Sequence, residues 1–249
     1  RAFVDYFIDN MNEKADFNSK GGSGTAIAPI PGAFDLKKRL NEQDGFTPLY
    51  LRVGENGEKG EKKRIISCVS RCLNSYTDFD AVMDCAKNPE LRFISCNTTE
   101  AGITYDPPAV LKTAPHQAIP EADPVSVPRF LTFGNEPGKG FIILACELID
   151  DNGKELEKCV LKYASQWNLG EDFIHWLQSE NVFCSTLVDR IVTGFPRAEA
   201  SALKEENGYE DNAMDTGEVF GFWVIEGPQS IKDELPIEKG QALPHPCNR

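Results

Sequence analysis

The sequence predicts an α/β domain built on a largely parallel sheet. Short apolar runs of strand length alternate with longer segments whose apolar residues recur at helical spacing, which is the pattern of strands joined by helices. The apolar runs stop abruptly at small or polar residues, as buried parallel strands do where they deliver a loop to the sheet edge. A chain of 249 residues is long enough for one large domain of this class, or for one domain and an appendage.

Residues 1–14 predict an amphipathic helix, with no capping residue visible before it. Its two sides carry Phe3, Phe7, Ile8 and Met11 against Asp5, Asp9 and Asn10. A glycine cluster at 21–24 and a short apolar run at 25–28 follow. The cluster matches neither glycine-rich phosphate-binding pattern, and it precedes a strand instead of following one. We therefore reject it as a dinucleotide-binding loop.

The middle of the chain continues the alternation of strands and helices. We expect a polar turn at 41–45, a strand at 49–53, a solvated hairpin at 54–63, a strand at 65–70, a helix at 78–86 and a strand at 91–96. Residues 106–137 are rich in proline and show little periodicity. A loop of this length inside a compact domain is either functional or incompletely represented.

The second half opens with residues 141–146, the strongest strand pattern in the chain. The remaining expectations are a turn at Asn152 and Gly153, helices at 155–167 and 171–179, an apolar run at 182–193 and a strand at 219–225. From residue 232 onward the chain becomes polar and contains proline.

Polar residues follow two of the predicted strands, at the position where open α/β sheets bind their ligands. Asn97, Thr98, Thr99 and Glu100 come directly after the strand at 91–96, and Glu147 ends the run at 141–146. An ordinary polar turn that caps the next segment explains the first group equally well. A carboxylate at a solvated strand edge explains Glu147, so both interpretations of each group stay open.

Asp189 and Arg190 are adjacent opposite charges inside the apolar run at 182–193. An unpaired buried charge is costly, so each should have a partner or face a polar ligand. A structural ion pair is one interpretation. The other is a contact with a carboxylate-bearing substrate, because the guanidinium fork accepts both carboxylate oxygens.

Composition and charge exclude several functions. The formal net charge of -13 provides no excess of Lys and Arg to neutralise phosphates, which argues against a nucleic-acid or anionic-membrane partner. No apolar stretch approaches the roughly 20 residues that a membrane span needs. The eight cysteines form no C-x-x-C pair and have no ligand spacing with histidine, so we expect buried thiols in a reduced cytoplasm and no metal site.

No catalytic acid or base can be identified from the residues alone. His175 falls off the apolar stripe of its helix, and His116 and His245 lie in irregular segments. No serine occupies a G-x-S-x-G elbow, so an α/β-hydrolase nucleophile has no candidate.

Seven motifs together resemble one enzyme family. They lie at residues 1–6, 41–45, 95–103, 146–150, 185–194, 195–197 and 207–211. These segments are similar to the long-chain mannitol dehydrogenase family, and within it to the enzymes that act on uronate sugars. The resemblance extends to about residue 236. It implies a partial Rossmann-like NAD-binding domain at 1–236 and an unmatched tail or linker at 237–249.

The resemblance implies an NAD-dependent interconversion of D-tagaturonate and D-altronate, with a small sugar acid as substrate. The family's glycine-rich motif ends in an Arg-Ala pair similar to Arg1 and Ala2, so its glycines and the first strand would precede residue 1. The segment 97–100 would line the nicotinamide. Ser185 stands where the mannitol enzymes carry an Asn that polarises the reacting oxygen, and a hydroxyl can also donate a hydrogen bond there. Glu147, Asp189 and Arg190 are the other expected substrate contacts.

The family's catalytic Lys, with its Asn and His partners, lies in a motif that this sequence does not contain. The resemblance therefore implies that a helical C-terminal domain completes the site, that no catalytic residue lies in this chain, and that this chain alone is inactive. Two alternatives stay open: a fructuronate reductase of the same family, and a short non-catalytic binding module on the same scaffold.

Overall fold

The computed structural model describes residues 2–14, 22–28, 34–55, 58–97, 103–105, 131, 134 and 137–240. The elements in chain order are α1 (Val4–Glu13), β1 (Gly24–Ala28), α2 (Phe34–Glu42), β2 (Thr47–Glu55), β3 (Glu58–Ile66), β4 (Val69–Asn74), α3 (Phe79–Lys87), β5 (Phe93–Cys96), β6 (Ile142–Ala145), α5 (Asn152–Gln166), α6 (Glu171–Glu180), β7 (Val182–Asp189), β8 (Val192–Gly194), α7 (Ala200–Asn207), β9 (Asp215–Glu218), β10 (Phe222–Glu226), α8 (Ile231–Glu234) and α9 (Ile237–Gly240).

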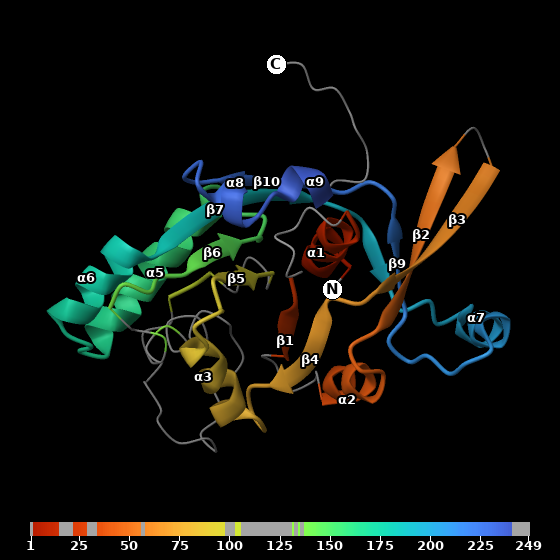
Figure 1. The fold of residues 1–249 in the computed structure, drawn as a ribbon, viewed down its shortest axis with the longest axis horizontal. Helices are drawn as coiled ribbons and strands as arrows, with labels where there is room; N and C mark the ends of the chain where they lie inside the picture. The colour runs from red at the N-terminus through yellow and green to blue at the C-terminus, as the bar shows by residue number, and fades with distance from the viewer. Residues whose placement is uncertain are drawn as a thin grey trace.

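The predicted parallel sheet is present, in two parts. One part has the strand order β10-β7-β6-β5, with β5, β6 and β7 parallel and β10 antiparallel at its edge. The other part is the parallel pair β1-β4. Figure 1 shows β1 on the side of β4 that faces β5. The expectation that a first strand precedes residue 1 stays a prediction, and a strand between β1 and β5 would join the two parts.

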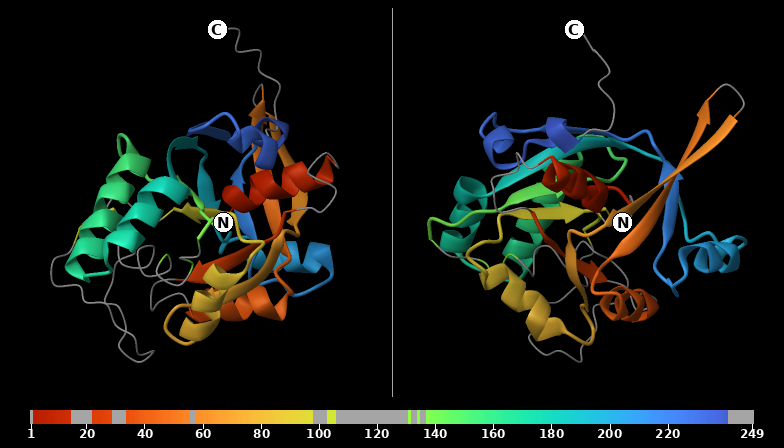
Figure 2. Two further views of the ribbon diagram at one scale, coloured as in Figure 1. Left: turned by 60° about the vertical axis from the view of Figure 1, so that its left-hand side comes forward. Right: turned by 45° about the vertical axis from the view of Figure 1, so that its right-hand side comes forward.

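Helices on both faces hold the two parts of this sheet together. On one face, α1 packs with Ala26 of β1 and with Phe93 of β5 in the same apolar cluster. On the other face, the buried side of α3 contacts Leu73 of β4 and Ile94 of β5. The helices α5 and α6 then cover β6 and part of β7 through a second large cluster. The arrangement has three layers, with helices on both sides of a sheet (Figure 2).

A further sheet, which the sequence did not predict, has the strand order β3-β2-β9-β8. Its strands β2 and β9 are parallel, and its other neighbours are antiparallel. The β2–β3 hairpin projects from the body of the molecule (Figure 1). Next to this sheet, Leu203 of α7 packs against Tyr50 and Met214.

The helix predicted at 1–14 is confirmed as α1, but two of the residues predicted on its polar side are buried. Asp9 and Asn10 are buried rather than solvated. The carboxylate of Asp9 accepts hydrogen bonds from Arg64 Nε at 2.7 Å and from the backbone N–H of Ser67 at 2.8 Å. A buried carboxylate is stable when it is paired in this way. The second partner is 58 residues away in sequence, so no local pattern could show it.

Two further predictions are wrong at element boundaries. Residues 65–70 do not form one strand, because β3 ends at Ile66 and β4 begins at Val69. Asn152 and Gly153 do not form a turn; they are the first two residues of α5, and both are buried. The chain turns one residue earlier, at Asp151, whose φ of 53° is left-handed. The helices α2 and α7 and the strand β9 were not predicted.

The predicted helices and strands at 49–53, 78–86, 91–96, 141–146, 155–167 and 171–179 are confirmed as β2, α3, β5, β6, α5 and α6. The expected loop at 106–137 lies almost entirely outside the described residues. None of the helices in the described part of the chain is both long and apolar enough to cross a membrane.

Candidate functional site

The carboxyl ends of β5 and β6 lie in one row of paired residues with the middle of β7. Cys96 at the end of β5 pairs with Ala145 at the end of β6, and Ala145 pairs with Ser185 of β7. The residues that continue past this row therefore gather at one edge of the sheet, where an open α/β sheet receives its ligand. Asn97 follows β5 directly and is exposed, so it is accessible at this edge.

Glu147 lies two residues beyond β6 at the same edge, and it is buried. The interpretation of Glu147 as a carboxylate at a solvated strand edge is therefore wrong. The backbone carbonyl of Glu147 accepts a hydrogen bond from Asn152 Nδ2 at 2.8 Å. The structure thus holds Glu147 against the start of α5 rather than in open solvent.

Asn152 joins three segments of the edge. Its Nδ2 donates to the carbonyls of Glu147 and Thr186, each at 2.8 Å, and its Oδ1 accepts from the N–H of Thr186 at 2.9 Å. The Asn152 side chain is fully buried. Because buried amide groups are stable only when hydrogen-bonded, this residue fixes the loop after β6, the start of α5 and the middle of β7 relative to one another.

Ser185 lies in the centre of this arrangement. Its Oγ accepts a hydrogen bond from the backbone N–H of Gly153 at 3.2 Å. A hydroxyl has one proton to donate and two lone pairs. The Gly153 contact uses a lone pair and leaves the Ser185 proton available for another acceptor. Glycine is required at 153, since a Cβ there would lie 2.4 Å from the backbone carbon of Cys184.

Asp189 and Arg190 diverge rather than pair. Alternate residues of a strand face opposite sides of the sheet, so Asp189 shares the face of Ser185, and Arg190 follows on the other face. Asp189 is exposed. The guanidinium of Arg190 lies over the ring of Tyr6 at 3.7 Å from its centroid, and its Nη2 donates to the carbonyl of Glu218 at 2.9 Å. Burial lowers the pKa of Arg190, while Tyr6 and Asp5 raise it.

The N-terminus of α1 lies near the carboxyl end of β7. Phe3 and Phe7 pack on Trp223 with ring centroids 5.4 and 5.5 Å apart, and Trp223 pairs with Val188 of β7. Ala2 precedes the helix and is buried, with a left-handed φ of 57°.

Asp5 caps the start of α1. Its Oδ1 accepts from the N–H groups of Phe3 and Tyr6, both at 3.0 Å, where a negative charge complements the helix dipole. Arg1, Thr98, Thr99 and Glu100, the remaining predicted cofactor contacts, lie outside the described residues.

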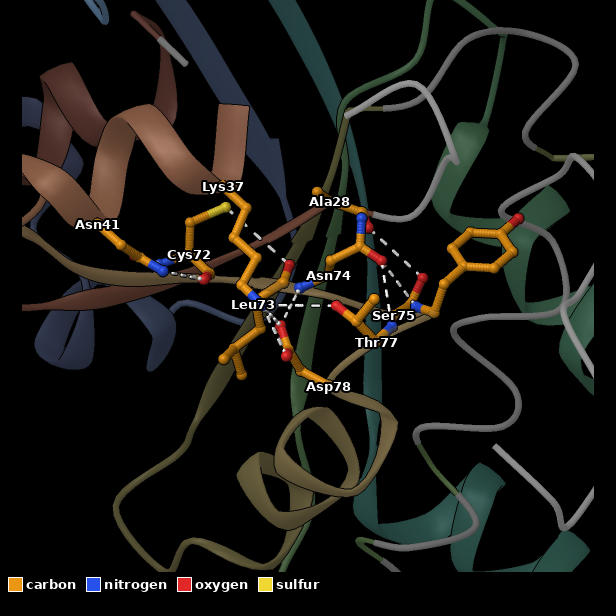
Figure 3. Close-up of polar contacts among 10 residues, drawn as sticks. Ala28, Lys37, Asn41, Cys72, Leu73, Asn74, Ser75, Thr77 and Asp78 are labelled. Carbon is orange, nitrogen blue, oxygen red and sulfur yellow. Dashed lines mark hydrogen bonds and ion pairs between the residues drawn. The ribbon is translucent and has the colours of Figure 1, made fainter. Parts of the chain in front are cut away.

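A second polar cluster lies where β1 and β4 end (Figure 3). The carboxylate of Asp78 accepts from Lys37 Nζ at 2.7 Å and from the backbone N–H of Asn74 at 2.8 Å. The N–H of Ser75 donates to the carbonyl of Ala28 at 3.2 Å. Burial raises the pKa of Asp78, but the Asn74 hydrogen bond and Lys37 outweigh burial and hold that pKa below its usual value. These contacts tie α2, α3 and the two strand ends together.

Two buried cysteines near the candidate site, Cys146 and Cys184, are not nucleophiles. Burial raises the pKa of Cys146 to about 12 and that of Cys184 to about 11. Both thiols are therefore protonated near neutral pH, and the thiolate is the reactive form. Nowhere among the described residues do three or more His, Cys, Asp or Glu side chains gather as a metal site requires.

Sequence reasoning missed Asn152 and Tyr6. Asn152 was assigned to a turn because Asn-Gly is a strong turn signal, and only its contacts with β7 show its role. Tyr6 was placed on neither side of the helix predicted at 1–14. The sequence signal for this contact is an aromatic residue, Tyr6, on a helix that can pack against the buried Arg190 and form a cation–π contact.

The comparisons with known proteins agree with this geometry. The family model described as "Mannitol dehydrogenase Rossmann domain" matches residues 1–239. An altronate oxidoreductase of Klebsiella pneumoniae is 45% identical over 241 residues, which cover 96% of this chain and 49% of that protein. An altronate oxidoreductase of Escherichia coli is 44% identical over 241 residues, which again cover 96% of this chain and 49% of that protein. The chain thus spans about half the length of the curated relatives it matches.

Two solved structures share the fold. A ternary complex of Pseudomonas fluorescens mannitol 2-dehydrogenase with NAD and D-mannitol has a TM-score of 0.75 at 22% identity, covering 92% of this chain and 47% of that one. A D-sorbitol dehydrogenase in substrate-free form has a TM-score of 0.73 at 19% identity, covering 96% of this chain and 50% of that one.

Proposed function

The chain belongs to the mannitol dehydrogenase family and matches the Rossmann domain of that family. We propose that the whole protein is an NAD-dependent oxidoreductase that interconverts D-tagaturonate and D-altronate. The single observation that carries the proposal is the row Cys96–Ala145–Ser185. It places an available hydroxyl donor on β7, two strands from the end of β5, at the edge where this fold binds a dinucleotide. The altronate oxidoreductases at 44–45% identity support the sugar-acid substrate.

The described residues fit an NAD site at this edge. The parallel strands β5 and β6 end together beside Ser185, in the middle of β7. The N-terminus of α1 lies close to the end of β7 through the contacts of Phe3 and Phe7 with Trp223. A helix N-terminus beside the carboxyl edge of a parallel sheet favours a pyrophosphate, although the N–H groups of Phe3 and Tyr6 already donate to the Asp5 carboxylate. Arg1 and Ala2 are the proposed contacts there, and the segment 97–100 is the proposed lining of the nicotinamide. NAD supplies the group that accepts or donates the hydride.

The chain's own contribution to the reaction is to bind and orient. Ser185 donates its hydroxyl proton to the reacting oxygen of the substrate, because the Gly153 N–H holds Oγ by a lone pair. Asn152 keeps Ser185 in position by fixing β7 to α5. Asp189 shares the face of Ser185 and Glu147 lies at the same edge, so both are proposed to contact the hydroxyl groups of the sugar acid.

Arg190 was expected to hold the substrate carboxylate, and its geometry does not favour that role. On the face opposite Ser185, its guanidinium lies over Tyr6 and its Nη2 donates to the carbonyl of Glu218. Its buried Nε and Nη1 have no hydrogen-bond partner among the described residues. We propose instead that it positions the end of β7 against α1. The group that holds the carboxylate would then come from the other half of the full-length protein, as would the general acid or base. We propose that this half is a helical domain and that the Rossmann domain comprises residues 1–236.

The test is an assay of NADH oxidation by the full-length gene product, with tagaturonate and fructuronate supplied separately. Turnover of tagaturonate in clear preference to fructuronate is the expected result. The opposite preference would move the protein to the fructuronate branch of the family. If neither uronate is reduced while binding of NADH persists, the oxidoreductase proposal is wrong and a non-catalytic binding module remains.

A further inference from the structure

The end of β1 carries no carboxylate of its own. In a dinucleotide-binding fold, the strand after the first helix ends beside the adenosine ribose, and an Asp or Glu there binds the 2′-hydroxyl of NAD. The strand β1 follows α1 and ends at Ala28. Residues 29–33 lie outside the described residues, and their sequence contains neither Asp nor Glu. Asp35 comes next, but its carboxylate is 84% exposed. A carboxylate that selects NAD would therefore come from another segment.

The turn after β4 brings a carboxylate to this place. The N–H and the hydroxyl of Ser75 both donate to the carbonyl of Ala28, at 3.2 and 3.4 Å, so the turn crosses the end of β1. Three residues later, the Asp78 carboxylate accepts from the backbone N–H of Asn74 at 2.8 Å. This bond folds the turn back onto the strand ends (Figure 3). The Asp78 side chain is 20% exposed, so a ligand at the edge can reach it.

Asn74 leaves a donor without an acceptor at the same edge. It pairs with Ala28 at the end of β4 and is fully buried. Its Oδ1 accepts from the N–H of Tyr76 at 2.9 Å. Its Nδ2 is buried and has no hydrogen-bond partner among the residues that the structure describes. Because an unsatisfied buried amide donor is destabilising, this group points to a ligand that brings an acceptor, such as a ribose hydroxyl.

Lys37 of α2 is the counter-ion of Asp78. Its Nζ lies 2.6 and 2.7 Å from the two carboxylate oxygens, and 3.5 Å from the hydroxyl of Thr77. The Asn74 hydrogen bond and Lys37 hold the pKa of Asp78 below its usual value, so this carboxylate is charged at neutral pH. The pair therefore presents a negative charge whose nearby cation is already bound.

We propose that Asp78 makes this protein select NAD over NADP, and that it does so by facing the adenosine ribose and by holding Lys37 in an ion pair. This inference rests on the NAD site of the proposed function. The 2′-hydroxyl of NAD can donate to a carboxylate. The 2′-phosphate of NADP would meet a like charge, and Lys37 could bind that phosphate only by leaving Asp78.

A purely structural ion pair makes a different prediction. If Asp78 and Lys37 only tie α2 to the turn after β4, their loss lowers the stability of the protein and weakens both dinucleotides to the same extent. The ratio of the two dissociation constants then stays constant. This ratio therefore separates a residue that faces the ribose from one that only supports the fold.

The test measures the Kd of NADH and of NADPH for the full-length protein by fluorescence titration, without a uronate. We expect the unmodified protein to bind NADH more tightly. Asp78→Asn removes the charge, keeps an acceptor for the Asn74 N–H and leaves Lys37 unpaired. It should lower the ratio of the NADPH Kd to the NADH Kd at least about tenfold. Adding Lys37→Gln to this variant should restore most of the ratio.

Asp35→Asn is the matched control. It frees a cation of the same helix, since Asp35 pairs with Arg39 at 3.8 Å, but this pair is exposed. The ratio should not change. An unchanged ratio in Asp78→Asn, or an equal shift in Asp35→Asn, would overturn the proposal.

Lys37→Gln alone decides the question if urea denaturation shows that Asp78→Asn does not fold. Without its counter-ion the Asp78 carboxylate should repel the 2′-phosphate more strongly, so NADPH should bind about threefold more weakly while the NADH Kd stays constant. No change in either Kd would overturn the proposal. Equal binding of NADH and NADPH by the unmodified protein would overturn this inference alone, whereas a protein that binds neither would overturn the proposed function with it.

Discussion

The guanidinium carbon of Arg190 lies 3.7 Å from the centroid of the Tyr6 ring. Tyr6 belongs to the first turn of α1 and Arg190 follows the last residue of β7, so this contact joins the helix at the start of the chain to the far end of the parallel sheet. Burial lowers the pKa of Arg190, and Tyr6 and Asp5 act against that effect. The stacked pair is thus a structural cation held in place by an aromatic face.

Arg190→Lys is expected to lower the free energy of unfolding of the full-length protein by about 1–2 kcal/mol, because an ammonium keeps the charge but loses the planar stacking on Tyr6 and the hydrogen bond to Glu218. Urea denaturation measures the change. Arg39→Lys, at an exposed position on α2, is the control and should change stability little.

A double-mutant cycle separates this contact from the burial of the Tyr6 ring. Tyr6→Leu alone removes the ring, and the cycle with Arg190→Lys should give a coupling energy of about 0.5–2 kcal/mol. Additive losses from the two substitutions would mean that the stacking contributes nothing to stability.

Asp78 gives the fold a dependence on acid. The pKa of this carboxyl is held below its usual value in the folded chain, because the Asn74 hydrogen bond and Lys37 outweigh burial. Between the folded and unfolded pKa values the unfolded chain binds more protons. The stability that Asp78 contributes is therefore complete above the ordinary Asp pKa of about 3.9, and it is lost as the pH falls through the lower folded value.

Asp78→Asn tests this relation. At about pH 7 it should cost about 1–2 kcal/mol of unfolding free energy, and the difference from the unmodified protein should shrink at about pH 3. Asp35→Asn, whose carboxylate is 84% exposed in a pair with Arg39, should show neither effect. A constant cost for Asp78→Asn at both pH values would contradict the pKa direction.

The sequence was sufficient for elements whose signal is local. Local patterns were enough to predict four elements, because burial acts on one strand or one helix face at a time. These patterns are the apolar run of β6 and the helical spacing of apolar residues in α3, α5 and α6. The polar residues after β5 and Ser185 were predicted from the end of a strand and from a family motif, and their roles stay predictions.

The features that were missed depend on residues far apart in the sequence. Asp9 is stable in the interior because Arg64 reaches it from β3. The four residues of β9 contain no large apolar side chain, and they form a strand because β2 supplies the hydrogen-bonding partner. Asn152 likewise has the local signal of a turn residue, and only its hydrogen bonds to the backbone of β7 show its structural role. Long-range pairing of this kind overrides local propensity.

Asn152→Ala is expected to destabilise the protein by about 2–4 kcal/mol, because it leaves the backbone groups of Glu147 and Thr186 without their buried partner. The measurement is again urea denaturation. Gln178→Ala on the exposed side of α6 should change stability by less than about 0.5 kcal/mol. If Asn152→Ala were no more costly than this control, the three hydrogen bonds would not hold the edge together.

Ser185→Ala tests the candidate site itself in the full-length protein. Loss of a donor to the reacting oxygen should lower kcat by about a hundredfold, since that hydrogen bond strengthens as charge develops in the transition state. The KM for the uronate and the binding of NADH should change little.

Ser185→Asn introduces the residue type that the family resemblance implies at this position and supplies an amide N–H, so it should retain more activity than Ser185→Ala. A structural role for Ser185 would give a different pattern: both variants would lose unfolding free energy because the Gly153 N–H loses its acceptor, and kcat and KM would change together. Steady-state kinetics and urea denaturation of the two variants therefore distinguish a hydroxyl that acts on the substrate from one that only caps α5.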